Sequence, residues 1–199
     1  MGQEENKQLI DSAFLKLDDQ AKLQEALLIK QATYWLKENN FFKERLSIVG
    51  INSPEKLTLE LLKAIPTCNK NDLAEFSINM QTTGIAIGDY CTTSGTTGKP
   101  ITIPLTFSDI ERLGWNEAIS YTSMELTIND VIMLCTTVDR TFMAGLAYLE
   151  GARKMKIPLV RAGIINPGMH WEHIHQYKVT TLVSVPSYWL KLLNFAKEN

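Results

Sequence analysis

The 199-residue chain is 45% hydrophobic and 21% charged, which is enough apolar material for a buried core in one large domain or two small ones. Its 20 basic and 22 acidic residues give a net charge of −2, so nothing in the charge indicates binding to nucleic acid or to an anionic membrane. No apolar run approaches the roughly 20 residues of a membrane span. No signal-peptide core follows the polar N-terminus, and we therefore expect a cytoplasmic protein.

The first part of the chain has the apolar periodicity of α-helices. Apolar residues recur at helical spacing through residues 7–46, where an aromatic cluster is expected to pack in the core: Tyr34, Trp35, Phe41 and Phe42. Ser53 is followed by proline and glutamate, which predicts a helix that begins there and ends before Pro66. We assign residues 1–76 to a helical N-terminal region.

From about residue 78, short β-type runs alternate with helical ones. Strands are predicted at 101–105, 131–135, 158–161 and 179–185, and helices at 108–125, 142–154, 169–177 and 187–196. A capping box that starts at Ser108 is expected to open the first of these helices. The alternation predicts an α/β fold in which residues 77–199 form a layered, mostly parallel sheet after the helical segment.

One stretch of this α/β region concentrates hydroxyl groups, glycines and a lysine: Thr93, Ser94, Gly95, Thr96, Thr97, Gly98 and Lys99. Glycine allows backbone amides to converge on an anion, hydroxyls add donors, and the lysine adds a positive charge. The stretch is not a Walker-type loop, because Lys99 is followed by Pro100 and the two glycines are only three residues apart. We interpret it as a phosphate-binding loop, with a Ser/Thr/Gly-rich surface turn as the alternative.

A second polar group, Asp-Arg-Thr-Phe at residues 139–142, follows the strand predicted at 131–135. In an open parallel sheet, the loops at the carboxyl ends of the strands border the ligand crevice. Contacts with a substrate and a solvated ion pair are both consistent with this group.

The remaining chemically reactive side chains give weaker signals. His170 and His173 share a helix face beside Glu172, but the spacing lacks His-Glu-x-x-His, so a polar helix surface is favoured over a metal site. A hydrolase with Ser94 as nucleophile is disfavoured because the Gly-x-Ser-x-Gly elbow is absent. The wide spacing of the cysteines predicts reduced, mostly buried thiols: Cys68, Cys91 and Cys135.

Residues 93–100 resemble the signature loop of the adenylate-forming (AMP-binding) superfamily, which includes acyl-CoA synthetases, luciferases and peptide-synthetase adenylation domains. Four more segments resemble, in the right order, stretches of its phenylacetate–CoA ligase branch: 65–73, 104–110, 145–152 and 181–188. The resemblance runs from about residue 65 to residue 199. It implies the first part of the large domain of an AMP-forming ligase.

The resemblance implies a two-step reaction that uses ATP, Mg²⁺ and CoA. A small carboxylic acid is activated as acyl-AMP, and a thiol then displaces AMP. The phenylacetate–CoA ligase branch suggests that this acid is an aryl acid. Residues 93–99 would hold the β- and γ-phosphates of ATP. The residues that match pocket-lining positions are the acyl-pocket candidates: Phe142, Met143, Gly145, Pro186, Ser187 and Tyr188. A homodimer is a further expectation.

The chain also departs from the family pattern. Within the 199 residues there is no Tyr-Gly-x-[Thr/Ser]-Glu segment, whose glutamate binds magnesium in the family, and no counterpart of its C-terminal lid domain with the catalytic lysine. We therefore expect an N-terminal portion of a ligase that does not complete adenylation by itself, and we assign no catalytic residue. The alternative is a non-catalytic nucleotide- or phosphate-binding module or partner subunit.

Overall fold

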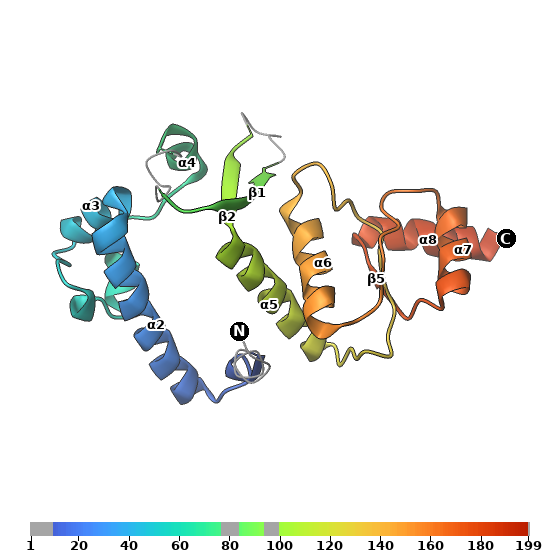
Figure 1. Cartoon of the computed structure of the whole chain (residues 1–199), viewed down its shortest axis with the longest axis horizontal. Helices are drawn as coiled ribbons and strands as arrows, with labels where there is room; N and C mark the ends of the chain where they lie inside the picture. Colours follow the sequence, from blue (N-terminus) through green and yellow to red (C-terminus); the bar gives the residue numbers. More distant parts are fainter. Residues whose placement is uncertain (1–9, 77–83, 94–99, 199) are drawn as a thin grey trace. The chain divides into compact units, whose positions relative to one another are not determined.

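The structure is a computed structural model that describes residues 10–76, 84–93 and 100–198 (Figure 1). Its contacts divide the chain into two compact units. We call them the helical unit, chiefly residues 11–76, and the α/β unit, residues 87–93 and 103–198, and describe each by itself. Within the described ranges, no helix is long and apolar enough to cross a membrane.

Two helices form the frame of the helical unit, α2 (Leu17–Glu38) and α3 (Asn40–Ile48). Asn39 separates them with an extended backbone, and its side chain accepts a hydrogen bond from the amide of Phe42 at 3.1 Å. The helical prediction for this region is confirmed. A small apolar core holds the unit together: Leu28, Ala32, Leu46, Ile51 and Leu57.

The predicted aromatic cluster is confirmed for three of its four members. The ring of Trp35 stacks on Phe42 with centroids 4.8 Å apart, and Phe41 meets Phe42 edge-on at 5.3 Å. Tyr34, in contrast, lies on the solvent side of α2 and is 37% exposed, so its assignment to the core was wrong.

The continuous helix predicted from Ser53 to Pro66 is also wrong. Two short 3₁₀ helices, η1 (Pro54–Lys56) and η2 (Leu61–Ala64), take its place, and the side chain of Ser53 makes no cap hydrogen bond. The physical reason lies at Leu57, which has an extended backbone and is buried in the core at 2% exposure. Burial of this side chain outweighs the local preference for a helix.

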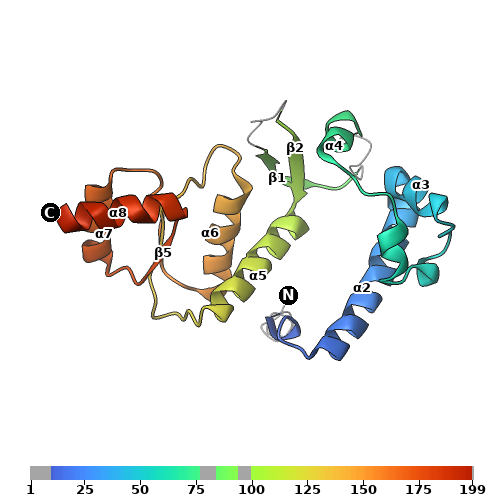
Figure 2. The same ribbon diagram turned by 180° about the vertical axis from the view of Figure 1, so that it is seen from behind.

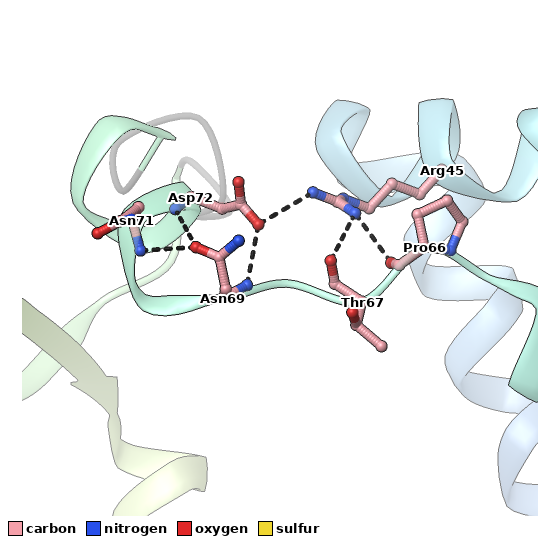
Figure 3. A network of polar contacts seen from close by, with 6 residues as sticks. All are labelled: Arg45, Pro66, Thr67, Asn69, Asn71 and Asp72. Carbon is pink, nitrogen blue, oxygen red and sulfur yellow. Dashed lines mark hydrogen bonds and ion pairs between the residues drawn. The ribbon is translucent and has the colours of Figure 1, made fainter.

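The last helix of this unit, α4 (Lys70–Phe76), is fixed by a reciprocal cap at its start. The Asn69 side chain accepts from the amides of Asn71 and Asp72 at 2.8 and 3.1 Å, and the Asp72 carboxylate accepts from the amide of Asn69 at 2.9 Å. Each side chain thus satisfies a backbone donor that the helix leaves unpaired (Figure 3).

Arg45 of α3 fastens the segment that precedes α4 (Figure 3). Its guanidinium donates to the carbonyls of Pro66 and Thr67 at 2.8 and 3.1 Å and lies 3.7 Å from the Asp72 carboxylate. It also lies over the ring of Phe41, 4.4 Å from the centroid. One side chain therefore holds both the loop and the cap of α4.

Replacing Arg45 by methionine should lower the free energy of unfolding of the helical unit by about 1–2 kcal/mol, because two backbone carbonyls lose a charged donor. Urea denaturation followed by far-ultraviolet circular dichroism measures this loss. The control is Lys43→Met, on the exposed side of the same helix, which should change stability by less than about 0.5 kcal/mol. Equal effects of the two substitutions would contradict the tethering role of Arg45.

The α/β unit contains two groups of strands. β1 (Ile87–Thr92) pairs with β2 (Thr102–Thr106), and β3 (Ile132–Leu134) pairs in parallel with both β4 (Leu159–Val160) and β5 (Thr181–Val183). The second sheet has the order β4-β3-β5, which confirms the predicted parallel α/β fold. Its helices are α5 (Phe107–Ser123), α6 (Met143–Met155), α7 (Pro167–Tyr177) and α8 (Pro186–Glu198).

Within this unit, the parallel sheet lies between two layers of helices. Figures 1 and 2 show α5 and α6 on one side of it and α7 and α8 on the other. Ile132 and Leu134 of β3 pack in a core with Tyr121 of α5 and Ala152 of α6. Met133 alternates to the opposite face and is fully buried. Both faces of this strand are therefore buried.

The capping box of α5 lies two residues earlier than predicted. Thr106, the last residue of β2, accepts from the amide of Asp109 at 3.1 Å, and Asp109 accepts from the amide of Thr106 at 3.0 Å. The predicted start at Ser108 was wrong because the chain turns into the helix directly from the strand.

Candidate functional site

The predicted phosphate loop follows β1. Of its seven residues the structure describes Thr93, and the other six lie outside the described residues: Ser94, Gly95, Thr96, Thr97, Gly98 and Lys99. Their role stays a prediction. What the structure does describe is how the strand that leads into the loop is held.

The carboxyl end of β1 is fastened to the loop that follows β3. The amide of Thr92 donates to the carbonyl of Thr141 at 3.0 Å, and the two hydroxyl oxygens lie 2.5 Å apart. Arg140 and Thr141 both have left-handed backbones, with φ of 57° and 58°. This conformation is uncommon for residues with a side chain, and the bonds to Thr92 hold it.

A pocket of about 530 Å³ opens at the carboxyl ends of β3 and β4. It is lined by two loops, each of which directly follows a strand: Thr136, Thr137, Val138, Asp139 and Arg140, then Arg161, Gly163 and Ile164. The sequence prediction that placed residues 139–142 near a crevice named Asp139 and Arg140 correctly as loop residues at a strand end. It missed Arg161, although the same rule applied to the strand predicted at 158–161 selects it.

Among the described residues that line this pocket, Asp139 is the one carboxylate. The Thr137 hydroxyl donates to it, and this bond, with the nearby charge of Arg140, holds the pKa of the Asp139 carboxyl below its usual value. Asp139 is therefore ionised at neutral pH.

A buried histidine, His170, contacts the second loop at Gly163. His170 is fully buried, with Nδ1 2.6 Å from the Tyr188 hydroxyl and Nε2 3.2 Å from the carbonyl of Gly163. A carbonyl only accepts, so Nε2 carries the proton, and burial lowers the pKa of His170, which keeps the ring neutral. Nδ1 then accepts from the hydroxyl of Tyr188. The polar-surface interpretation was wrong for His170, since its polar atoms are satisfied inside the unit.

The acyl-pocket candidates lie in two groups. Phe142 is 41% exposed at the start of α6, and Met143 is half-buried beside it. Gly145 is buried where α6 crosses the residues 137–138, so closely that an added Cβ would lie 2.0 Å from the carbonyl oxygen of Thr137. Pro186 and Ser187 are exposed at the start of α8, next to the half-buried Tyr188.

The other reactive side chains offer no second site in the part of the chain that the structure describes. No three His, Cys, Asp or Glu residues there are grouped so as to hold a metal ion. All three cysteines are free; Cys91 and Cys135 are buried and Cys68 is exposed. Burial raises the pKa of Cys135 to about 11, so this thiol stays protonated.

Comparison with known proteins connects this geometry to one fold. No protein-family model matches the chain, and no curated protein matches it. A solved structure of 2-hydroxyisobutyryl-CoA ligase, in complex with 2-HIB-AMP and CoA in the thioesterification state, matches with a TM-score of 0.78 and 21% identity. That match covers 92% of this chain and 41% of the ligase chain.

An open conformation of 2-hydroxyisobutyryl-CoA ligase, also with 2-HIB-AMP and CoA, matches with a TM-score of 0.77 and 20% identity over 92% of this chain and 44% of that one. The chain thus spans less than half the length of the solved proteins it matches. It has the fold of a part of this CoA ligase, which confirms the predicted α/β fold class; the predicted resemblance to AMP-forming ligases is confirmed as a likeness of fold.

Proposed function

We propose that the chain forms the N-terminal portion of an ATP-dependent, AMP-forming carboxylic acid–CoA ligase. One observation carries the proposal: 92% of the chain has the fold of a ligase whose solved structures contain an acyl-AMP and CoA. The signature-like stretch at residues 93–99 supports it independently, because it begins directly after the end of β1. A strand end beside a crevice is where nucleotide-binding α/β proteins place such loops.

In this proposal, residues 93–99 hold the β- and γ-phosphates of ATP. Preorganised amide, hydroxyl and ammonium donors stabilise the charge that builds up on the leaving pyrophosphate when the acid attacks the α-phosphate. The bonds between Thr92 and Thr141 fix the position from which the loop departs. Mg²⁺ would enter with ATP and neutralise phosphate charge; the described residues offer no three-ligand cluster for it, so we assign it to no residue.

The acid substrate is proposed to be small, and an aryl acid is the class that the resemblance to phenylacetate–CoA ligases suggests. Phe142, Met143 and Gly145 at the start of α6, with residues 186–188 at the start of α8, are the proposed acyl-pocket residues. CoA is the proposed thiol, and a homodimer is the proposed assembly.

Titration of the isotopically labelled chain with pyrophosphate or Mg²⁺–ATP, followed by nuclear magnetic resonance, tests the phosphate loop. We expect chemical-shift changes at residues 92–99, and at least 10-fold weaker binding in Lys99→Ala, since a direct charge contact is worth about 1.4 kcal/mol or more. Ser94→Ala should weaken binding less. Lys191→Ala, on the exposed side of α8, is the control and should bind as the wild type does. If both loop variants bind pyrophosphate and Mg²⁺–ATP as tightly as the wild type does, residues 93–99 are a surface turn and not a phosphate site.

The exchange of labelled pyrophosphate into ATP tests the catalytic half of the proposal. The 199-residue polypeptide should show no exchange with any carboxylic acid, and robust exchange would overturn the proposed dependence on further residues. Coding sequence that continues in frame into a Tyr-Gly-x-[Thr/Ser]-Glu segment would distinguish a ligase portion from a separate binding module.

A further inference from the structure

The pocket at the carboxyl ends of β3 and β4 has an excess of positive charge. Arg140 and Arg161, one from each loop, line it, and both are exposed to solvent. Across residues 10–76, 84–93 and 100–198, neither guanidinium takes part in an ion pair within 4.0 Å. Asp139 supplies one negative charge, and its carboxylate is already engaged by the hydroxyl of Thr137. With two guanidinium groups and one carboxylate, the described lining carries a net positive charge.

Both loops that carry these arginines are fixed by hydrogen bonds to neighbouring strands, one to β1 and the other to β3. Arg140 lies in a left-handed stretch that the Thr92–Thr141 bonds hold in place. On the other side, the amide of Gly163 donates to the carbonyl of Leu134 at 2.9 Å. The carbonyl of Gly163 accepts from His170, as described above. These hydrogen bonds restrain the backbone on both sides of the pocket, and restraint of this kind reduces the entropic cost of binding a ligand.

We propose that this pocket binds an oxyanion, carboxylate or phosphate, between Arg140 and Arg161. A guanidinium presents a planar fork of donors that matches the paired oxygens of either group. A volume of about 530 Å³ suits a small ligand. The source of the anion rests on the proposed function: it is either a second carboxylate on the acid substrate or a phosphate of CoA.

The test is a residue-resolved magnetic-resonance titration of the 199-residue chain without ATP. The probes are succinate, inorganic phosphate, and the uncharged diamide of succinate. We expect shifts at residues 136–140 and 161–164 with at least one anion and none with the diamide. Arg161→Gln and Arg140→Gln should each weaken that binding at least 10-fold, and Arg161→Lys should weaken it less, because it keeps the charge and loses the fork.

The matched control is Arg153→Gln, whose guanidinium pairs with Glu150 on α6 outside the pocket; it should bind as the wild type does. Stronger binding of succinate assigns the anion to the acid substrate, and stronger binding of phosphate assigns it to CoA. Shifts that persist in Lys99→Ala separate this pocket from the phosphate loop, so either proposal can fail alone. Absence of shifts at both pocket loops, or an affinity that Arg161→Gln leaves unchanged, overturns the proposal.

Discussion

Replacing Gly145 by alanine is expected to cost the α/β unit more than about 3 kcal/mol of its free energy of unfolding. A Cβ at this position would lie 2.0 Å from the carbonyl oxygen of Thr137 and 2.8 Å from Cα of Val138. Both are backbone atoms of a loop held against the sheet, so neither can rotate away as a side chain would. The helix α6 has to shift, which opens its packing against β3 and α5.

Urea denaturation followed by circular dichroism measures this loss for Gly145→Ala. Gly168→Ala, at the start of α7, is the matched control, because the atoms nearest to its added Cβ belong to side chains and not to the backbone: the ring of Phe195, at 3.2 Å, and Asn166, at 3.3 Å. Since alanine also favours a helix, this control should be neutral to within about 1 kcal/mol. If the two variants unfold at the same urea concentration, the close approach at Gly145 is not what positions α6.

Replacing His170 by phenylalanine should cost about 1–3 kcal/mol at pH 7.5, because the carbonyl of Gly163, which is only partly exposed, loses its donor. The Tyr188 hydroxyl keeps an acceptor in this variant, because the carbonyl of Ile165 lies 3.2 Å away. Chemical denaturation of the two proteins at pH 7.5 gives the difference. His175→Phe, at an exposed position of the same helix, should have little effect.

The same histidine predicts a pH dependence with a definite sign. Burial lowers the pKa of His170 from its usual 6.5, so below pH 6.5 the unfolded chain binds a proton that the folded chain does not. The free energy of unfolding should therefore be greatest above pH 6.5 and fall as the pH drops below it, until the folded-state pKa is passed. His170→Phe should flatten this part of the profile. A wild-type profile that rises on acidification, or a slope unchanged in the variant, would contradict a buried neutral ring.

Sequence periodicity was sufficient for most of the α/β unit. The apolar run at 131–135 predicted β3, and the small-residue helix at 142–154 predicted α6, because buried strands and packed helices leave strong local patterns. It failed between Ser53 and Pro66, where burial of one leucine decided the backbone. Local pattern carries no record of such a long-range contact.

The candidate site was less accessible to sequence reasoning than the fold. The position of residues 139–142 at a strand end was predictable, whereas their attachment to Thr92 was not, because the bonded threonines are 49 residues apart. The sequence predicted a surface position for His170, because the residues around it do not indicate its contact with Tyr188, 18 positions further along the chain. Pairs of this kind are set by tertiary structure alone.

The attachment of Thr92 to Thr141 has a thermodynamic consequence. It joins the strand that leads into the proposed phosphate loop to the residue that follows Arg140, so a ligand that restrains one threonine restrains the other. Phosphate on the loop and an oxyanion in the pocket would then bind cooperatively, and each would change the affinity for the other by the same factor. Thr141→Val removes the hydroxyl contact and should bring that factor closer to one.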